Sequence, residues 1–401
     1  MPPSPPKPPP GRPCDDAGAT ATATAATAAA PPKPPPRTLR PPPSSLAPTP
    51  ARLSHLVSAW APTLRLHPTD AYHPCSGAWF AARSVLLERT GGRVLAPVGR
   101  ASVAAAVAAA EGAAAAHPAD PVGAARAVRL ALDVTARHGQ PLAELDAHVP
   151  LYVRAQLAIP AAGEGSGGGG RPTLELAYVA LYAHNGPYFP LGAGWGGPSV
   201  GAHDGDLERL TVRLDAESGE LLGAWFNSHR PRDGAWAGAG GVEIEAATGR
   251  PVAYVARHGH GTYPTPGIHA RAWGLANDHC SAAGATWRPG SVVLLAADRG
   301  DLHPAPGAAS APELGFVECR GCEVLGGDGR AVCDATPPRG RPPRSQHADV
   351  RVLPDADGFG AFPGLWGETA GLRSQGWWAR AECPVSRGVL KRLFLEGWPE
   401  A

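Results

Sequence analysis

Two carboxylates lie in a row of core-type side chains within GAHDGDLERLTVRLD, residues 201–215. Successive side chains of a β-strand point to opposite faces of the sheet, so Asp206 and Glu208 share one face with the apolar residues that follow them. That face carries Asp206, Glu208, Leu210, Val212 and Leu214, and the other carries Leu207, Arg209, Thr211 and Arg213. An ionised carboxylate that points into a core is costly unless a cation or hydrogen-bond donors meet it. We therefore expect other segments to bring such partners to this strand.

Histidines and carboxylates at the ends of later strand-like segments are the candidate partners. In VAYVARHGHGTYP, alternation places His258 and His260 on the face of Tyr254, provided that the strand runs unbroken through Gly259. If the strand ends meet at one edge, the predicted cluster consists of His203, Asp206, Glu208, His229, His260 and Asp278. A mixture of imidazoles and carboxylates suits Zn, Mn or Fe, whereas a carboxylate-dominated site suits Ca or Mg. The cluster therefore predicts a divalent metal ion of unidentified element.

Each of these residues also has a simpler interpretation. Glu208 could pair with Arg209 or Arg213 of a neighbouring strand, and a single histidine such as His203 or His229 commonly forms only a loop hydrogen bond. Ser228 precedes His229 directly, which places the two on opposite faces of a strand and not in a nucleophile–base pair. The chain has no glycine-rich phosphate loop and no GxSxG nucleophile motif. The residues alone do not define a reaction.

The elements that would position this cluster have the pattern of a β protein. Residues 173–182, TLELAYVALY, are apolar on both faces except at Glu175, as expected for a central strand. Short strand-like segments follow: LERLTVRL, ELLGAWF, VEIEA, RPVAYVARH and SVVLLAA. Two alanine-rich segments, Ala101–Ala116 and Ala124–Arg137, have the composition of helices. We predict a mainly β fold, an antiparallel β-sandwich or jelly-roll-like domain with a few helices.

The domain boundaries follow from composition. Residues 1–50 contain two PPKPPP repeats and almost no large apolar side chains, so we expect a disordered tail that could dock in the aromatic groove of an SH3-type partner. Residues 51–401 are expected to form a single β-rich domain, with a loop insertion at about 300–347. Within that insertion, Cys319, Cys322, Cys333 and His347 offer a conceivable zinc set, but we favour chance cysteines in an unstructured segment.

Charge and hydropathy exclude several classes of protein. A formal net charge of +1 provides no basic field for nucleic acid. The chain shows no apolar stretch that predicts a transmembrane segment and no apolar secretory signal. We expect an intracellular protein, cytoplasmic or peripheral to endomembranes, and leave peripheral membrane contact and organelle targeting open.

Five segments together resemble the vacuolar protein sorting-associated protein 62 family in its plant-type form. They are LRLHPTDAYHPCSGAWF (64–80), GAHDGDLERLTVRL (201–214), NSHRPRDGAW (227–236), PVAYVARHGHGTYPTPG (251–267) and ND (277–278). The resemblance adds His67, Asp70, Tyr72 and Asn277 as ligand-binding candidates. Leu207 stands where the family usually has Trp, Cys75 where Ser is expected, and Asn227 and Arg230 alter the serine–glutamine–histidine segment.

The resemblance implies a part in delivering proteins to the vacuole, without an established activity. Our first hypothesis is a non-catalytic β-sandwich whose polar rim binds a metal ion or a polar ligand such as a glycan or lipid headgroup. A second hypothesis is a metal-dependent hydrolase with Asp206 or Glu208 as the base. An enzyme needs an open coordination position and room for substrate, whereas a structural site is closed. A third hypothesis is an adaptor that acts through the proline-rich tail.

Overall fold

The computed structural model describes residues 47–88, 92–158, 171–187, 202–228, 230–270, 277–295 and 350–367. Its helices are α1 (Pro50–Ala59), α2 (Gly77–Ala82), α3 (Val103–Ala116), α4 (Pro121–Arg126) and α5 (Leu145–His148). The first four begin at side-chain caps, because the Thr49, Ser76, Ser102 and Asp120 side chains each accept a hydrogen bond from a backbone N–H of the first turn. The expected helix at Ala101–Ala116 is therefore present, two residues shorter.

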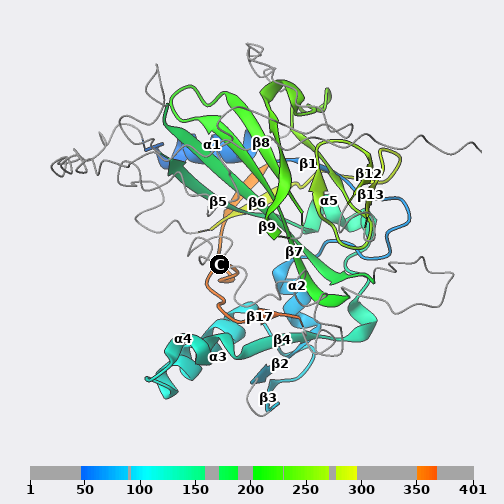
Figure 1. Cartoon of the computed structure of the whole chain (residues 1–401). Coiled ribbons are helices and arrows are strands. Elements are labelled where there is room, and N and C mark those ends of the chain that lie inside the picture. Colours follow the sequence, from blue (N-terminus) through cyan, green and yellow to red (C-terminus); the bar gives the residue numbers. More distant parts are fainter. Residues whose placement is uncertain are drawn as a thin grey trace, which may run out of the picture. The chain divides into compact units, whose positions relative to one another are not determined.

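Strand residues outnumber helical residues in the described chain (Figure 1). They are β1 (Thr63–Arg65), β2 (Ser84–Glu88), β3 (Val94–Ala96), β4 (Val128–Leu132), β5 (Leu151–Ala158), β6 (Thr173–Asn185), β7 (His203–Asp215), β8 (Leu221–Ser228), β9 (Arg230–Gly238), β10 (Val252–Val255), β11 (Thr262–Tyr263), β12 (Gly267–His269), β13 (Asp278–Cys280), β14 (Thr286–Trp287), β15 (Ser291–Leu294), β16 (Arg351–Pro354) and β17 (Leu365–Trp366). The predicted mainly β fold is confirmed.

Among the described residues the largest sheet has seven strands in the order β16-β15-β5-β6-β7-β8-β9. Neighbouring strands from β5 to β9 are antiparallel, as expected. The structure departs from a purely antiparallel arrangement elsewhere, since β15 runs parallel to both β5 and β16, β1 is parallel to β10, and β17 is parallel to β4. These parallel pairs join segments that are distant in the sequence. A prediction based on strands joined by short connections could therefore not include them.

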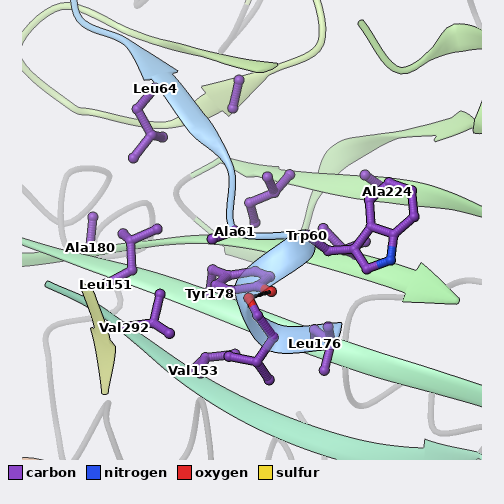
Figure 2. Close-up of a cluster of buried hydrophobic side chains, with 14 of the residues drawn as sticks. Trp60, Ala61, Leu64, Leu151, Val153, Leu176, Tyr178, Ala180, Ala224 and Val292 are labelled. Atoms are coloured by element: carbon purple, nitrogen blue, oxygen red, sulfur yellow. Dashed lines mark hydrogen bonds between the residues drawn. The ribbon is translucent and has the colours of Figure 1, made fainter. Parts of the chain in front are cut away.

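The seven-stranded sheet has a hydrophobic core on each face. On one face, α1, β1 and β14 pack against β5–β8 through side chains such as Trp60, Leu64 and Leu176 (Figure 2). Tyr178 belongs to this core, and its hydroxyl donates a hydrogen bond to the carbonyl oxygen of Val57 at 2.8 Å. Leu210, Val212 and Leu214 of β7 lie in the same core, which confirms the predicted alternation.

The second core lies on the opposite face of the same sheet. There Ala177, Val179 and Leu181 of β6 pack with Phe80 and Trp366, next to α3 and the sheet β17-β4-β2-β3 (Figure 1). Because successive residues of β6 enter different cores, this strand is apolar on both faces. Glu175 is the exception, as noted from the sequence, and it is buried in an ion pair with Arg213 at 2.7 Å.

Two element predictions were wrong. The segment Ala124–Arg137 is not one helix, because α4 ends at Arg126 and β4 follows it. Val128, Leu130 and Leu132 alternate with more exposed residues, which is the period of a strand and not of a helix. VEIEA is not a strand either, and only Ile244 forms an isolated bridge, to Pro251.

Several predictions fall outside the described residues. They include most of the expected tail at 1–50, the insertion at about 300–347 with its cysteines, and His229. No helix in the described part of the chain is long and apolar enough to cross a membrane.

Candidate functional site

A polar row continues the first core toward one end of β6 and β7. In the antiparallel register His184 lies opposite Asp204, Tyr182 opposite Asp206, and Ala180 opposite Glu208. Asp204, Asp206 and Glu208 are all buried, with exposed fractions of 5%, 7% and 7%. The carboxylates therefore extend the core-facing row. Each buried negative charge needs a cation or hydrogen-bond donors to offset the cost of its burial.

The turn between β10 and β11 brings the imidazole partner. The strand does not run through Gly259 as predicted: β10 ends at Val255, and the chain reverses through a turn in which His258 (φ 69°) and His260 (φ 54°) have left-handed backbone conformations. The N–H of His260 donates to the carbonyl oxygen of Ala256 at 3.0 Å and closes this turn. Alternation consequently does not apply to His258 and His260, which point in directions set by the turn.

His260 lies between two carboxylates. Its Nδ1 is 2.8 Å from Asp206 Oδ2, and its Nε2 is 3.4 Å from Asp70 Oδ2, a charge contact without hydrogen-bond geometry. Burial of this fully enclosed ring opposes its protonation, but the charge of Asp70 and the hydrogen bond to Asp206 raise the pKa of His260 to about 9. The imidazolium is therefore the cation that meets the buried Asp206.

Asp70 reaches the site from the segment that precedes α2. Its Oδ1 accepts a hydrogen bond from the Tyr72 N–H at 3.1 Å, and its Oδ2 accepts one from the His258 N–H at 3.0 Å. Burial works against the charge, but the His260 cation and these donors lower the pKa of Asp70 to about 2. Asp70 thus fixes the β10–β11 turn as well as pairing with His260.

Tyr182 covers one face of the His260 ring. The two rings are stacked with centroids 3.9 Å apart and planes 6° from parallel. The Tyr182 hydroxyl is fully buried and has no hydrogen-bond partner among the described residues. Burial and then the negative charges of Glu208, Asp70 and Asp206 raise the pKa of Tyr182, so the hydroxyl stays neutral among the carboxylates.

A second part of the site surrounds Asp278 at the start of β13. Asp278 is completely buried, and the Tyr263 hydroxyl donates to its Oδ2 at 2.6 Å. Gly261 directly follows His260 and lies close to both Ser228 and Asp278. A Cβ atom at Gly261 would be 3.1 Å from Ser228 Cβ and 3.6 Å from Asp278 Oδ2. The Thr262 hydroxyl accepts from the Asn227 N–H and lies 3.0 Å from the Arg209 carbonyl oxygen, which anchors β11 over β7 and β8.

Sequence reasoning missed a third carboxylate centre on the same row. Asp204 Oδ1 is 2.6 Å from His184 Nδ1, and Arg137 binds both oxygens of Asp204 at 2.7 and 3.1 Å. Although burial opposes it, hydrogen bonds from His184 and Arg137 lower the pKa of Asp204. The alternation that selected Asp206 and Glu208 extends by two residues to Asp204, so the signal was present in β7.

The remaining candidates lie around this centre or apart from it. His203 Nε2 is 3.9 Å from Asp206 Oδ1, and burial lowers the pKa of His203. The Tyr72 ring packs edge-on against His184 and His258, with centroids 4.8 and 5.9 Å apart. His67 instead makes a local contact with Thr69, its Nδ1 accepting from the Thr69 N–H at 3.3 Å. Asn277 is half-buried directly before β13.

The contacts of His260 bear on the question of acid–base chemistry. Both nitrogens of His260 face carboxylates, so neither is placed to take a proton from a nucleophile. Within the described ranges, no group of three or more His, Cys, Asp or Glu side chains is arranged to hold a metal ion.

The fold and the site define a mainly β protein with a buried carboxylate–imidazole centre beside the ends of its central strands. Residues 196–282 match the model of the family described as vacuolar protein sorting-associated protein 62. The match spans less than a quarter of the chain, and within that part it agrees with the resemblance noted from the sequence. It contains Asp206, His260 and Asp278, whereas Asp70 lies outside it. No curated protein and no solved structure matches the chain.

Proposed function

We propose that this chain is a non-catalytic, vacuolar-sorting-associated protein whose rim binds a small cation beside Asp206. The observation that carries the proposal is the buried row of Asp204, Asp206 and Glu208, extended by the unpartnered hydroxyl of Tyr182. Burying carboxylates costs several kcal/mol per ion, to an order of magnitude, unless positive charge compensates them. Arg137 and His184 already compensate Asp204, and His260 compensates Asp206, so a bound cation would add to this charge at the end of the row.

The burial of the site supports a closed site and not a catalytic one. His260 and Asp278 are 0% exposed and Asp206 is 7% exposed. A metal-dependent hydrolase needs an open coordination position and space for its substrate beside the metal. A small ion needs neither, which is why we place binding ahead of hydrolysis. The family description, which refers to vacuolar protein sorting, supports a place at endomembranes.

The test measures metal content and metal-dependent stability of the full-length chain. Elemental analysis follows purification, and thermal melting is compared in EDTA and in millimolar Mg²⁺, Ca²⁺, Mn²⁺ or Zn²⁺. An ion present at 100 times its Kd adds about 2.7 kcal/mol to the stability, which corresponds to a rise of roughly 5–10 °C in Tm.

The matched variants are Asp206→Asn in the site and Asp357→Asn at an exposed position away from it. We expect Asp206→Asn to abolish the metal-dependent rise in Tm and Asp357→Asn to retain it. A wild-type Tm that is the same in EDTA and in every metal, together with no bound metal, would contradict the proposed function.

A further inference from the structure

Two exposed valines lie on either side of the C-terminal end of α2. Val98 is 44% exposed and Val134 is 64% exposed. The residue after Val98 donates its N–H to the carbonyl oxygen of Ala82 at 2.8 Å. The residue before Val134 donates its N–H to the carbonyl oxygen of Arg83 at 2.9 Å. Because these two carbonyl groups are consecutive, the chain holds both valines next to the same helix end.

Both valines occupy turns that hydrogen bonds hold closed. Val98 lies in the turn Pro97–Arg100, which a backbone hydrogen bond of 3.1 Å between its two end residues closes. Val134 begins the 3₁₀ helix Val134–Ala136, which starts at the side-chain cap of Asp133. Turn positions are dominated by Gly, Pro, Asn, Asp and Ser, each of which favours the turn itself. Valine does not favour either turn, so its presence at both points to a contact outside the chain.

Two arginines place positive charge at the same end of α2. Arg83 is the C-cap of α2, and its guanidinium lies 4.2 Å from the centre of the half-buried Trp79 ring. Arg100 ends the first of the two turns, and both arginines are exposed. Neither arginine forms an ion pair within the described part of the chain, and the carboxylate of Asp133 is hydrogen-bonded to Thr135. Two guanidinium groups beside one carboxylate leave this surface positive.

Exposed apolar side chains beside arginine and tryptophan fit the surface of an anionic bilayer. Apolar side chains enter the boundary between headgroups and acyl chains, arginine is attracted to anionic lipids, and tryptophan favours the membrane–water interface. A stable protein interface usually buries about 800 Å² per partner around a closely packed centre. A few side chains at turn tips suit a shallow contact with a bilayer better than such an interface.

We infer that the patch formed by Trp79, Arg83, Val98, Arg100 and Val134 docks on the surface of an anionic membrane. The two valines enter the headgroup–acyl boundary, and the two guanidinium groups bind lipid phosphates. The contact is peripheral and reversible, because two small side chains insert little apolar surface. It does not depend on the proposed cation at Asp206, so either proposal can fail without the other.

The experiment measures co-sedimentation of the full-length protein with vesicles of phosphatidylcholine and phosphatidylserine, and with vesicles of phosphatidylcholine alone. Replacing both arginines, Arg83→Gln with Arg100→Gln, should lower the partition coefficient on anionic vesicles about 30-fold, since each contributes about fivefold. Replacing both by lysine keeps the charge and should retain most of the binding. Val98→Ser with Val134→Ser should lower the partition coefficient about tenfold, because less apolar surface enters the bilayer.

Matched controls change exposed residues outside the patch. Arg351→Gln removes a cation from β16, and Ile268→Ser removes an apolar side chain from β12. Both variants should bind anionic vesicles as the wild type does. The basic residues of segment 1–50 remain in every variant, so their attraction to anionic lipid is the same throughout. Thermal melting shows whether each variant is folded.

Three outcomes overturn the inference. The first is a wild-type protein that binds neither kind of vesicle, or binds both equally. The second is unchanged binding to anionic vesicles in the arginine or the valine double variant, which would assign any binding to another part of the chain. The third is self-association of the wild type, measured by analytical ultracentrifugation, that the valine double variant abolishes while its vesicle binding stays unchanged. The patch would then be an interface between two copies of the chain.

Discussion

At the scale of single residues, His260 is the group that makes a buried Asp206 tolerable. A carboxylate on each side of the ring holds the imidazolium, and removal of one member leaves the others as uncompensated buried charges. The site is therefore a coupled network, in which the energy of one contact depends on whether the other is present.

A double-mutant cycle between Asp70 and His260 tests this coupling. Asp70→Asn alone should destabilise the fold by about 3–5 kcal/mol, because it leaves a buried cation with one partner fewer. In a His260→Gln background the same change should cost less, with a coupling free energy of about 0.5–3 kcal/mol measured by urea unfolding. Equal costs in the two backgrounds would show that Asp70 acts only through its backbone hydrogen bonds.

At the scale of elements, the β10–β11 turn decides where the imidazoles point. Both histidines of the HGH motif, His258 and His260, have positive φ values, a conformation that residues with a Cβ atom disfavour, and β-branched residues most of all. The turn also carries Gly261, whose lack of a side chain lets it approach Ser228 and Asp278. The backbone of this turn is thus as important to the site as its side chains.

Paired substitutions at His258 measure the backbone requirement. Both His258→Gly and His258→Val lose the imidazole, so their difference reports the cost of positive φ, and valine should be less stable by about 1–2 kcal/mol in thermal or urea unfolding. At His279, an exposed residue of β13, the order should reverse because valine favours strands. Equal stability of the two His258 variants would mean that the turn relaxes to another conformation.

Glu245 joins three further segments and gives an acid-dependent contribution to stability. It accepts hydrogen bonds from Thr63 of β1, from Thr248 and from Arg288. Although burial opposes the charge, these hydrogen bonds lower the pKa of Glu245 to about 2 from 4.5. The folded pKa is below the unfolded one, so this stabilisation is complete above pH 4.5 and is lost as the pH falls toward 2.

The expected result is a smaller loss of Tm between pH 4.5 and pH 2 in Glu245→Gln than in the wild type. The exposed Glu220, changed to Gln, serves as the control and should leave the wild-type profile unchanged. A profile of Glu245→Gln that parallels the wild type throughout this range would show that other carboxyls cause the acid sensitivity.

The sequence predicted those features that the local backbone period determines. The alternation along β7 correctly placed Asp206 and Glu208 beside the core, and the apolar pattern of β6 correctly indicated a strand covered on both faces. The β10–β11 turn was missed because His258 and His260 adopt positive φ, which a pattern of alternating residues does not reveal. The contact between Asp70 and His260 joins distant segments, so the sequence offered only the family resemblance for Asp70.

At the scale of the whole described fold, the central sheet is shared by two cores. Strand β6 contributes Leu176 to one and Val179 to the other, so the loss of either core would expose one face of this strand. Gly205 reinforces the connection, since its positive φ (71°) and lack of a Cβ let the backbone of β17 pass directly beside β7. The architecture therefore favours one cooperative unit.

Calorimetry of two core variants tests whether the two cores unfold together. Leu214→Ala removes a buried side chain from the first core and Leu86→Ala from the second, and each should cost about 2–5 kcal/mol. Because β6 is common to both, each variant should lower the temperature of a single transition, with calorimetric and van't Hoff enthalpies in agreement. A second transition that moves in only one variant would show instead that the sheet of β2, β3, β4 and β17 unfolds separately, and the carboxylate row, which lies on the face of the first core, would then depend on the first core alone.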